Sequence, residues 1–166
     1  MSCMRPLRLL TMSTLAALSL LAGLLATGAP AAQAAVPAAA APVLTPQAYA
    51  ARVAVLVNQQ RAKAKLRPLK VSACATKFAG AWSTRMAKTG AFNHQSLRPI
   101  MTGCKARGAG ENIAYGSVTP EQMMAMWMSS PGHKANILRP SYTHLGVGMA
   151  RSGASRWYGT QDFLTL

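Results

Sequence analysis

The spacing of apolar residues along the chain predicts a first helix after residue 44. Within residues 45–66 the apolar positions recur at steps of three and four: Tyr49, Val53, Leu56 and Val57. This period is typical of an amphipathic α-helix. Thr45 is a suitable N-cap, and Pro46 suits the first helical position, where the missing amide hydrogen of proline costs nothing.

A second helix is predicted over residues 73–89. Ser72 lies at its N-cap position, and Gly90 ends it because glycine readily adopts the left-handed conformation that closes a helix. The large apolar residues of this helix recur at steps of four, at Phe78, Trp82 and Met86. We expect them to form its core-facing side rather than a cofactor site.

Residues 89–117 are rich in Gly, Asn and Pro and are predicted to be mostly loop, with a short strand over residues 111–115. A further helix begins after Thr119, whose side chain and that of Gln122 form the pattern of a capping box around Pro120. A break at Ser130 then starts a short helix that extends to about residue 138.

The period changes to two near the C-terminus. Residues 144–150 alternate large apolar residues with glycine and alanine, and residues 156–166 are also typical of a strand. The short connection between them predicts a β-hairpin. The order of elements therefore predicts an α+β domain with a small antiparallel sheet covered by helices.

The first 34 residues have the pattern of a signal peptide. Arg5 and Arg8 precede a long apolar run, and small residues at positions 32 and 34 predict cleavage after Ala34, with Ala35 as a near alternative. A membrane anchor is the competing interpretation of the same run. Residues 35–46 form an Ala/Pro-rich linker, and residues 47–166 form one domain. We expect a secreted, extracellular protein with no transmembrane segment in its mature chain.

The chain is strongly basic, with 18 Lys and Arg against three acidic residues. Removal of residues 1–34 would leave sixteen basic residues and a formal charge of +13. This balance suggests anionic cell-envelope polymers or lipids as partners, although a basic surface without a specific partner is equally compatible. Aromatic residues are few and are not interleaved with basic ones, so no specific nucleic-acid binding is expected. We expect a monomer.

Two cysteines, Cys74 and Cys104, remain after the predicted cleavage. In an exported protein they are expected to form one disulfide, and two buried free thiols are the alternative.

The candidate groups for chemistry after cleavage are six side chains: His94, Glu111, Glu121, His133, His144 and Asp162. Glu121 lies in the first turn of a predicted helix, where a carboxylate complements the helix dipole. Asp162 is expected to pair with a basic residue, and His144 begins a strand without an evident partner.

His94, Glu111 and His133 each lie where a loop meets a predicted element, so they can converge on one pocket. Two imidazoles and a carboxylate suit a divalent ion such as Zn²⁺, and they equally suit proton transfer. The sequence contains no zincin helix, no nucleophile elbow and no phosphate-binding loop. Glu111 could instead simply accept backbone N–H bonds and hold its loop.

Four segments in this order resemble the bacterial branch of the CAP superfamily, whose module is also called the SCP-like extracellular domain: AFNHQSL, GAGENIAYG, TPEQMMAMWMSSPGHKANILRPSYTHLGVGMA and WYGTQDF. The resemblance implies an α-β-α sandwich with a surface cleft. It assigns His94, Glu111 and His133 to that cleft. Ser130 stands where many eukaryotic members have a second glutamate, so Glu111 is the only carboxylate expected there.

The family resemblance favours a secreted, non-enzymatic binding or interaction module. His94 and His133 are the candidate metal ligands for Zn²⁺ or another divalent cation. The alternative is a secreted hydrolase that uses Glu111 as base with the two cleft histidines, with or without metal.

Overall fold

The computed structural model describes residues 44–153 and 155–166. The predicted signal peptide and the linker up to residue 43 lie outside these residues. Within them the chain forms five helices and four strands: α1 (Pro46–Lys63), β1 (Lys70–Val71), α2 (Ala73–Thr89), α3 (Leu97–Gly103), β2 (Gly108–Gly116), α4 (Pro120–Ser129), α5 (Pro131–Ile137), β3 (His144–Ser152) and β4 (Arg156–Thr165).

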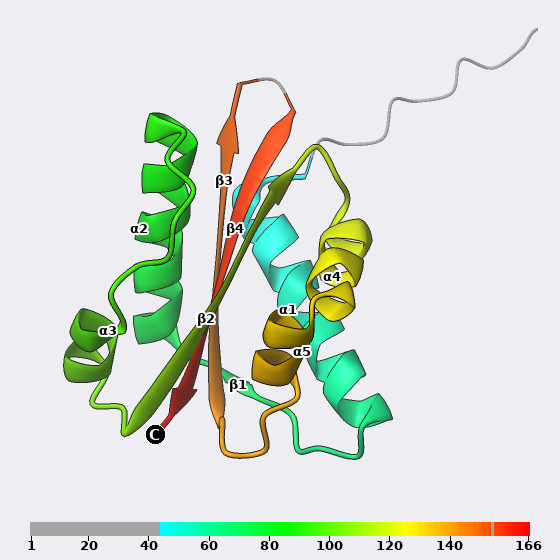
Figure 1. Ribbon diagram of the computed structural model, residues 1–166, viewed down its shortest axis with the longest axis vertical. Helices are drawn as coiled ribbons and strands as arrows, with labels where there is room; N and C mark the ends of the chain where they lie inside the picture. Colours follow the sequence, from blue (N-terminus) through cyan, green and yellow to red (C-terminus); the bar gives the residue numbers. More distant parts are fainter. Residues whose placement is uncertain (1–43, 154) are drawn as a thin grey trace, which may run out of the picture. The chain divides into compact units, whose positions relative to one another are not determined.

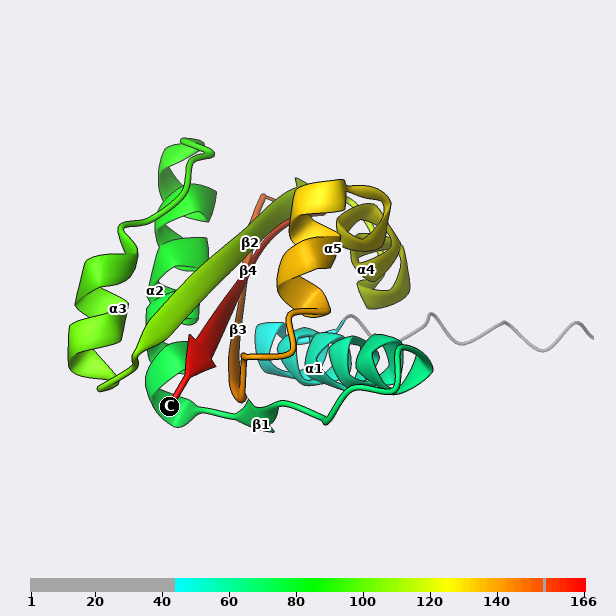
Figure 2. The ribbon, with the colours of Figure 1, turned by 60° about the horizontal axis from the view of Figure 1, so that its bottom comes forward.

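The strands form one sheet in the order β1-β3-β4-β2, with α2 and α3 on one face and α1, α4 and α5 on the other (Figures 1 and 2). This is the α-β-α sandwich that the family resemblance implied, and the predicted C-terminal hairpin is confirmed as β3 and β4. The β2–β4 pair is also antiparallel. The sheet is mixed rather than wholly antiparallel, because β1 pairs in parallel with the start of β3.

The predicted helix starts are confirmed by their hydrogen bonds. The Thr45 hydroxyl accepts from the Ala48 amide at 3.1 Å, and the Ser72 hydroxyl accepts from the Ala75 amide at 3.2 Å. Thr119 forms the expected capping box with Gln122. Gly90 ends α2 with φ of 73°, the left-handed conformation that its position required.

The contact between α2 and the sheet is made by smaller residues than the sequence suggested. Ala75, Ala79 and Ser83 are fully buried, whereas Phe78 and Trp82 are only half-buried. The helix lies so close to β3 that a Cβ added at Gly146 or Gly148 would overlap the α2 backbone. Phe78 and Trp82 therefore flank this close contact, whereas Met86, further along α2, is buried as predicted.

The larger apolar cluster lies on the other face of the sheet. Trp127 of α4 and Tyr49 of α1 are buried there with Phe163 of β4. Arg61 is also buried, and its guanidinium donates to the carbonyls of Ile137 and Arg139 at 2.9 Å each. This arginine joins the end of α1 to the chain that leaves α5.

Two elements were not predicted. The segment between the first two predicted helices contains the two-residue strand β1, and the segment predicted to be mostly loop contains α3. Pro99 is compatible with α3 because it lies in the first turn, where its missing amide hydrogen is not needed. Burial of Ile100 then holds this short helix against the domain.

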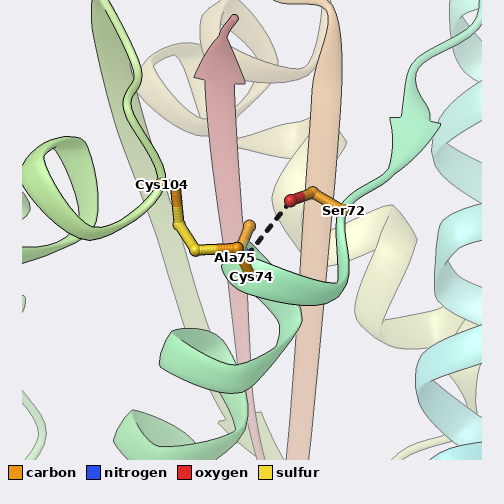
Figure 3. The surroundings of a disulfide bond; sticks show 4 residues. All are labelled: Ser72, Cys74, Ala75 and Cys104. Carbon is orange, nitrogen blue, oxygen red and sulfur yellow. Dashed lines mark hydrogen bonds between the residues drawn. A yellow bond between two sulfur atoms is a disulfide. The ribbon is translucent and has the colours of Figure 1, made fainter.

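The predicted disulfide between Cys74 and Cys104 is confirmed. It joins the first turn of α2 to the end of α3, beside the Ser72 cap (Figure 3). The bond closes a loop with a sequence separation of 30 residues. The loop-entropy treatment assigns such a bond about 3.5 kcal/mol of stabilisation. The bond joins the two ends of the segment that carries His94.

Candidate functional site

His94 and Glu111 are in direct contact. His94 lies in the connection between α2 and α3, and its Nδ1 is 2.5 Å from Oε1 of Glu111 on β2. The His94 side chain is 60% exposed, whereas that of Glu111 is 3% exposed. The carboxylate is therefore an inner group that orients an imidazole at the surface.

Gln95 occupies the remaining space around the Glu111 carboxylate. Its backbone amide donates to Oε1 at 3.2 Å, and its side-chain amide donates to Oε2 at 2.7 Å. The same side-chain nitrogen lies 3.0 Å and 3.2 Å from the two carboxyl oxygens of Asp162. One glutamine amide thus bridges two carboxyl groups.

Asp162 was expected to pair with a basic residue, and that prediction is wrong. It lies directly opposite Glu111 in the register of β2 and β4 and is 1% exposed. Burial, with the neighbouring Glu111 charge as the second cause, raises the pKa of Asp162 to about 8. Asp162 is therefore a second carboxyl group beside Glu111, and it is protonated at neutral pH. The expectation that Glu111 would be the only carboxyl group at this site is wrong.

Amide side chains hold α5 against β2 and so determine where His133 lies. The Asn136 amide donates to the Glu111 carbonyl at 3.0 Å and to the Asn112 side chain at 2.9 Å. The Asn112 amide donates in turn to the His133 carbonyl at 3.0 Å. Helix α5 therefore meets β2 at the residue that carries the buried carboxylate.

The two imidazoles approach the edge strand β2 from opposite layers of the sandwich. Burial lowers the pKa of His133, and the charge of nearby His94 lowers it further. His133 itself is half-buried. The structure thus brings His94, Glu111 and His133 together around one edge of the sheet.

Gly110 permits this arrangement. A Cβ at that position would overlap the hydroxyl of Tyr142 and would lie 3.1 Å from Oδ1 of Asn136. The glycine before Glu111 therefore leaves room for the residues that pack α5 and the following chain against β2.

Comparison with known proteins agrees with this fold. A model of the cysteine-rich secretory protein family, CAP, matches residues 55–163. The chain belongs to the CAP family.

The CAP chain is 42% identical over 124 residues to the protein YkwD of Bacillus subtilis (strain 168). This alignment covers 70% of the chain and 47% of YkwD. An extracellular protein from Bacillus anthracis that contains an SCP domain aligns with a TM-score of 0.64 at 25% identity, over 76% of this chain and 45% of the other. An outer surface protein from Borrelia burgdorferi aligns with a TM-score of 0.67 at 14% identity, over 74% and 96%. The chain spans about half the length of YkwD and of the anthracis protein.

Other predicted candidates lie outside this site in the CAP domain. Glu121 lies in the first turn of α4, as expected, and also accepts from Nε of Arg52 at 2.7 Å. That hydrogen bond is the main cause of its lowered pKa. His144 contacts the Thr143 hydroxyl at 2.8 Å through Nδ1. Ser130 is the residue before α5, and its side chain makes no capping hydrogen bond.

The described residues of the CAP domain offer limited means of binding a metal. Residues 44–153 and 155–166 contain no group of three or more His, Cys, Asp or Glu side chains arranged to hold an ion. Because Nδ1 of His94 is directed at Glu111, the nitrogens left to coordinate a metal are Nε2 of His94 and those of the His133 ring. This set fits a two-imidazole site completed by water, and not a closed structural zinc site.

A separate groove of about 480 Å³ lies at the β3 edge of the sheet, between α1 and α2. Its walls include Ala50, Ala54 and Val147, and none of the predicted site residues lines it. No helix in the described part of the chain is both long and apolar enough to cross a membrane.

Sequence reasoning missed Gln95 and Asn136, and it assigned Asp162 the wrong partner. The signal for Asp162 was its place among apolar residues in a strand, because a buried carboxyl group in such a strand needs a specific partner. Gln95 and Asn136 gave no comparable signal, since both are ordinary residues of loops and helix ends.

Proposed function

We propose that this CAP domain is a secreted module that binds a ligand at the His94–Glu111–His133 site and catalyses no reaction. The observation that supports this proposal is that both carboxyl groups of the site already accept hydrogen bonds from Gln95. Glu111 accepts hydrogen bonds from the Gln95 backbone and side chain and contacts His94, and Asp162 shares the same glutamine amide. A general base must reach a water molecule, whereas these carboxyls are buried and engaged.

Secretion is part of the proposal. It is supported by the predicted signal peptide, by the disulfide between Cys74 and Cys104, and by relatives described as extracellular or outer surface proteins. Disulfides persist in oxidising compartments outside the cytosol.

The hydrolase alternative has one supporting observation. A protonated carboxyl at Asp162 beside Glu111 is the kind of pair that separates acid and base roles in some enzymes. We expect a panel of peptide, glycan, ester and nucleic-acid substrates to show no turnover by the wild type above that of Glu111→Gln. Turnover that is abolished in Glu111→Gln would contradict the non-enzymatic proposal and establish the hydrolase.

We also propose that His94 and His133 hold a divalent cation weakly, with water as the remaining ligands. Isothermal titration of the wild type with Zn²⁺ is expected to give a binding heat that is lost in the double variant His94→Ala/His133→Ala. His144→Ala is the matched control, because it removes the remaining histidine, which bonds to Thr143 outside the site. Equal heats in the wild type and the double variant, or none in either, would remove the metal from the proposal.

A further inference from the structure

Two aromatic side chains lie exposed next to each other beside the candidate site. Of the aromatic residues in the described part of the chain, only Phe92 and Tyr115 are exposed, at 43% each. Their ring centroids are 4.7 Å apart at an interplanar angle of 66°, so they form a corner. Tyr115 also stacks on the buried ring of Tyr158, with a centroid distance of 5.6 Å. The corner therefore rests on a rigid base.

Cationic groups lie over this aromatic surface. The guanidinium of Arg156 lies 5.7 Å from the centroid of the Tyr115 ring, and that of Arg85 lies 5.0 Å from the Trp82 ring. The Trp82 indole donates to the Asn93 carbonyl at 2.9 Å, which joins it to the loop that carries Phe92. We call these five residues the aromatic rim: Trp82, Arg85, Phe92, Tyr115 and Arg156.

None of the acidic side chains in the described residues is known to balance the positive charge of the rim. Two of the chain's three acidic side chains, Glu111 and Asp162, are buried, and the third, Glu121, pairs with Arg52. The rim thus presents aromatic surface and positive charge together, which is complementary to a ligand that carries both rings and negative charge.

Part of the rim and part of the histidine site lie on the same two segments of the chain. Phe92 precedes His94 by two residues, and Tyr115 lies on the same strand and face as Glu111, four residues further along. Four residues of a strand span about 13 Å. A ligand that contacts both Tyr115 and the His94 imidazole is therefore an extended chain rather than a single small molecule.

We propose that the aromatic rim binds an anionic glycan chain, with sugar rings seated against Phe92 and Tyr115 and acidic groups paired with Arg156 and Arg85. This inference rests on the proposed binding function and names the class of its partner. Guanidinium groups bind carboxylates and phosphates through paired hydrogen bonds. The apolar C–H face of a sugar ring packs on an aromatic face while its hydroxyl groups stay in water.

The angle between the rings favours a glycan over a nucleic acid. Single-stranded nucleic acids bind where successive bases stack on aromatic platforms. Phe92 and Tyr115 are inclined at 66°, so they cannot offer parallel platforms to neighbouring bases. A corner of this kind suits a non-planar ring that has two differently oriented apolar edges.

The test uses the chain purified from the growth medium and polygalacturonate, a polymer of negatively charged sugar rings. We expect saturable binding that weakens with salt, and much weaker binding to neutral dextran. Binding is expected to weaken about tenfold in Phe92→Ala and in Arg156→Gln. Arg139→Gln is the matched control, because Arg139 also lies 5.5 Å over a tyrosine ring, that of Tyr142, outside the rim. It should bind as the wild type does.

Three outcomes would overturn the glycan proposal. They are equal loss in Arg139→Gln and Arg156→Gln, unchanged binding by Phe92→Ala with wild-type melting behaviour, and tighter binding to single-stranded oligodeoxythymidylate than to polygalacturonate. The zinc titration on the same rim variants separates the two proposals. If zinc binds but the glycan does not, the histidine-site proposal is retained and the glycan proposal is rejected. If the glycan binds but zinc does not, the glycan proposal is retained and the metal proposal is rejected.

Discussion

Gly148→Ala is expected to destabilise the domain by about 3 kcal/mol or more, with a corresponding fall in the midpoint of urea unfolding. The added Cβ would overlap the backbone of Ala79 and Gly80 in α2. Backbone atoms of a helix cannot rotate away as a side chain can, so α2 must move off the sheet. That movement would also disturb Ser83, whose hydroxyl donates to the Gly148 carbonyl at 2.9 Å.

Gly80→Ala is the matched control, since it introduces the same methyl group on the other side of this contact. A Cβ at Gly80 meets no atom within 4 Å. Alanine also has a higher helix propensity than glycine, so this variant is expected to gain about 0.5–1 kcal/mol. Equal stabilities for the two variants would show that α2 does not approach β3 as closely as described.

Asp162→Asn is expected to remove a large part of the dependence of stability on pH between about 4 and 8. In the folded chain the pKa of Asp162 is raised to about 8 from its ordinary value of 3.8. The folded state therefore holds one more proton than the unfolded state within that window, and the free energy of unfolding falls as pH rises. Asparagine does not titrate and keeps an oxygen that can accept from Gln95, so the variant loses this fall, an effect of about 2 kcal/mol or more.

Urea unfolding of both proteins at intervals from pH 4 to pH 9 measures this effect. Glu121→Gln is the control, because it removes the same charge from an exposed residue whose pKa is lowered by Arg52. Its pH dependence above pH 5 should follow that of the wild type. Parallel curves for Asp162→Asn and the wild type would mean that Asp162 is already ionised in the folded state.

Much of the architecture could be predicted because its causes are local. The caps at Thr45 and Ser72, the capping box at Thr119 and the turn at Gly90 each depend on a few neighbouring residues. The hairpin of β3 and β4 follows from period-two alternation and a short connection. Helix α3 was missed because its stability comes from burial of Ile100 and not from its own composition.

The candidate site was partly accessible in the same way. His94, Glu111 and His133 were selected because each lies at the junction of a loop and an element, and the family motifs named the same residues. Asp162 was misjudged because its environment is set by strand register, which places it opposite Glu111. Register depends on which strands pair across the whole domain, so no local pattern discloses it.

The sequence by itself determined the family, the order of the elements, the disulfide cysteines and the scarcity of acidic groups. The tertiary structure decided how close α2 lies to the sheet, that Gln95 bridges two buried carboxyl groups, and that Phe92 and Tyr115 meet at the surface. The physical reason is the separation along the sequence of the residues that interact. Capping, periodicity and motif spacing act within a few residues, whereas burial and the partners of a buried charge depend on segments that only the folded sheet brings together.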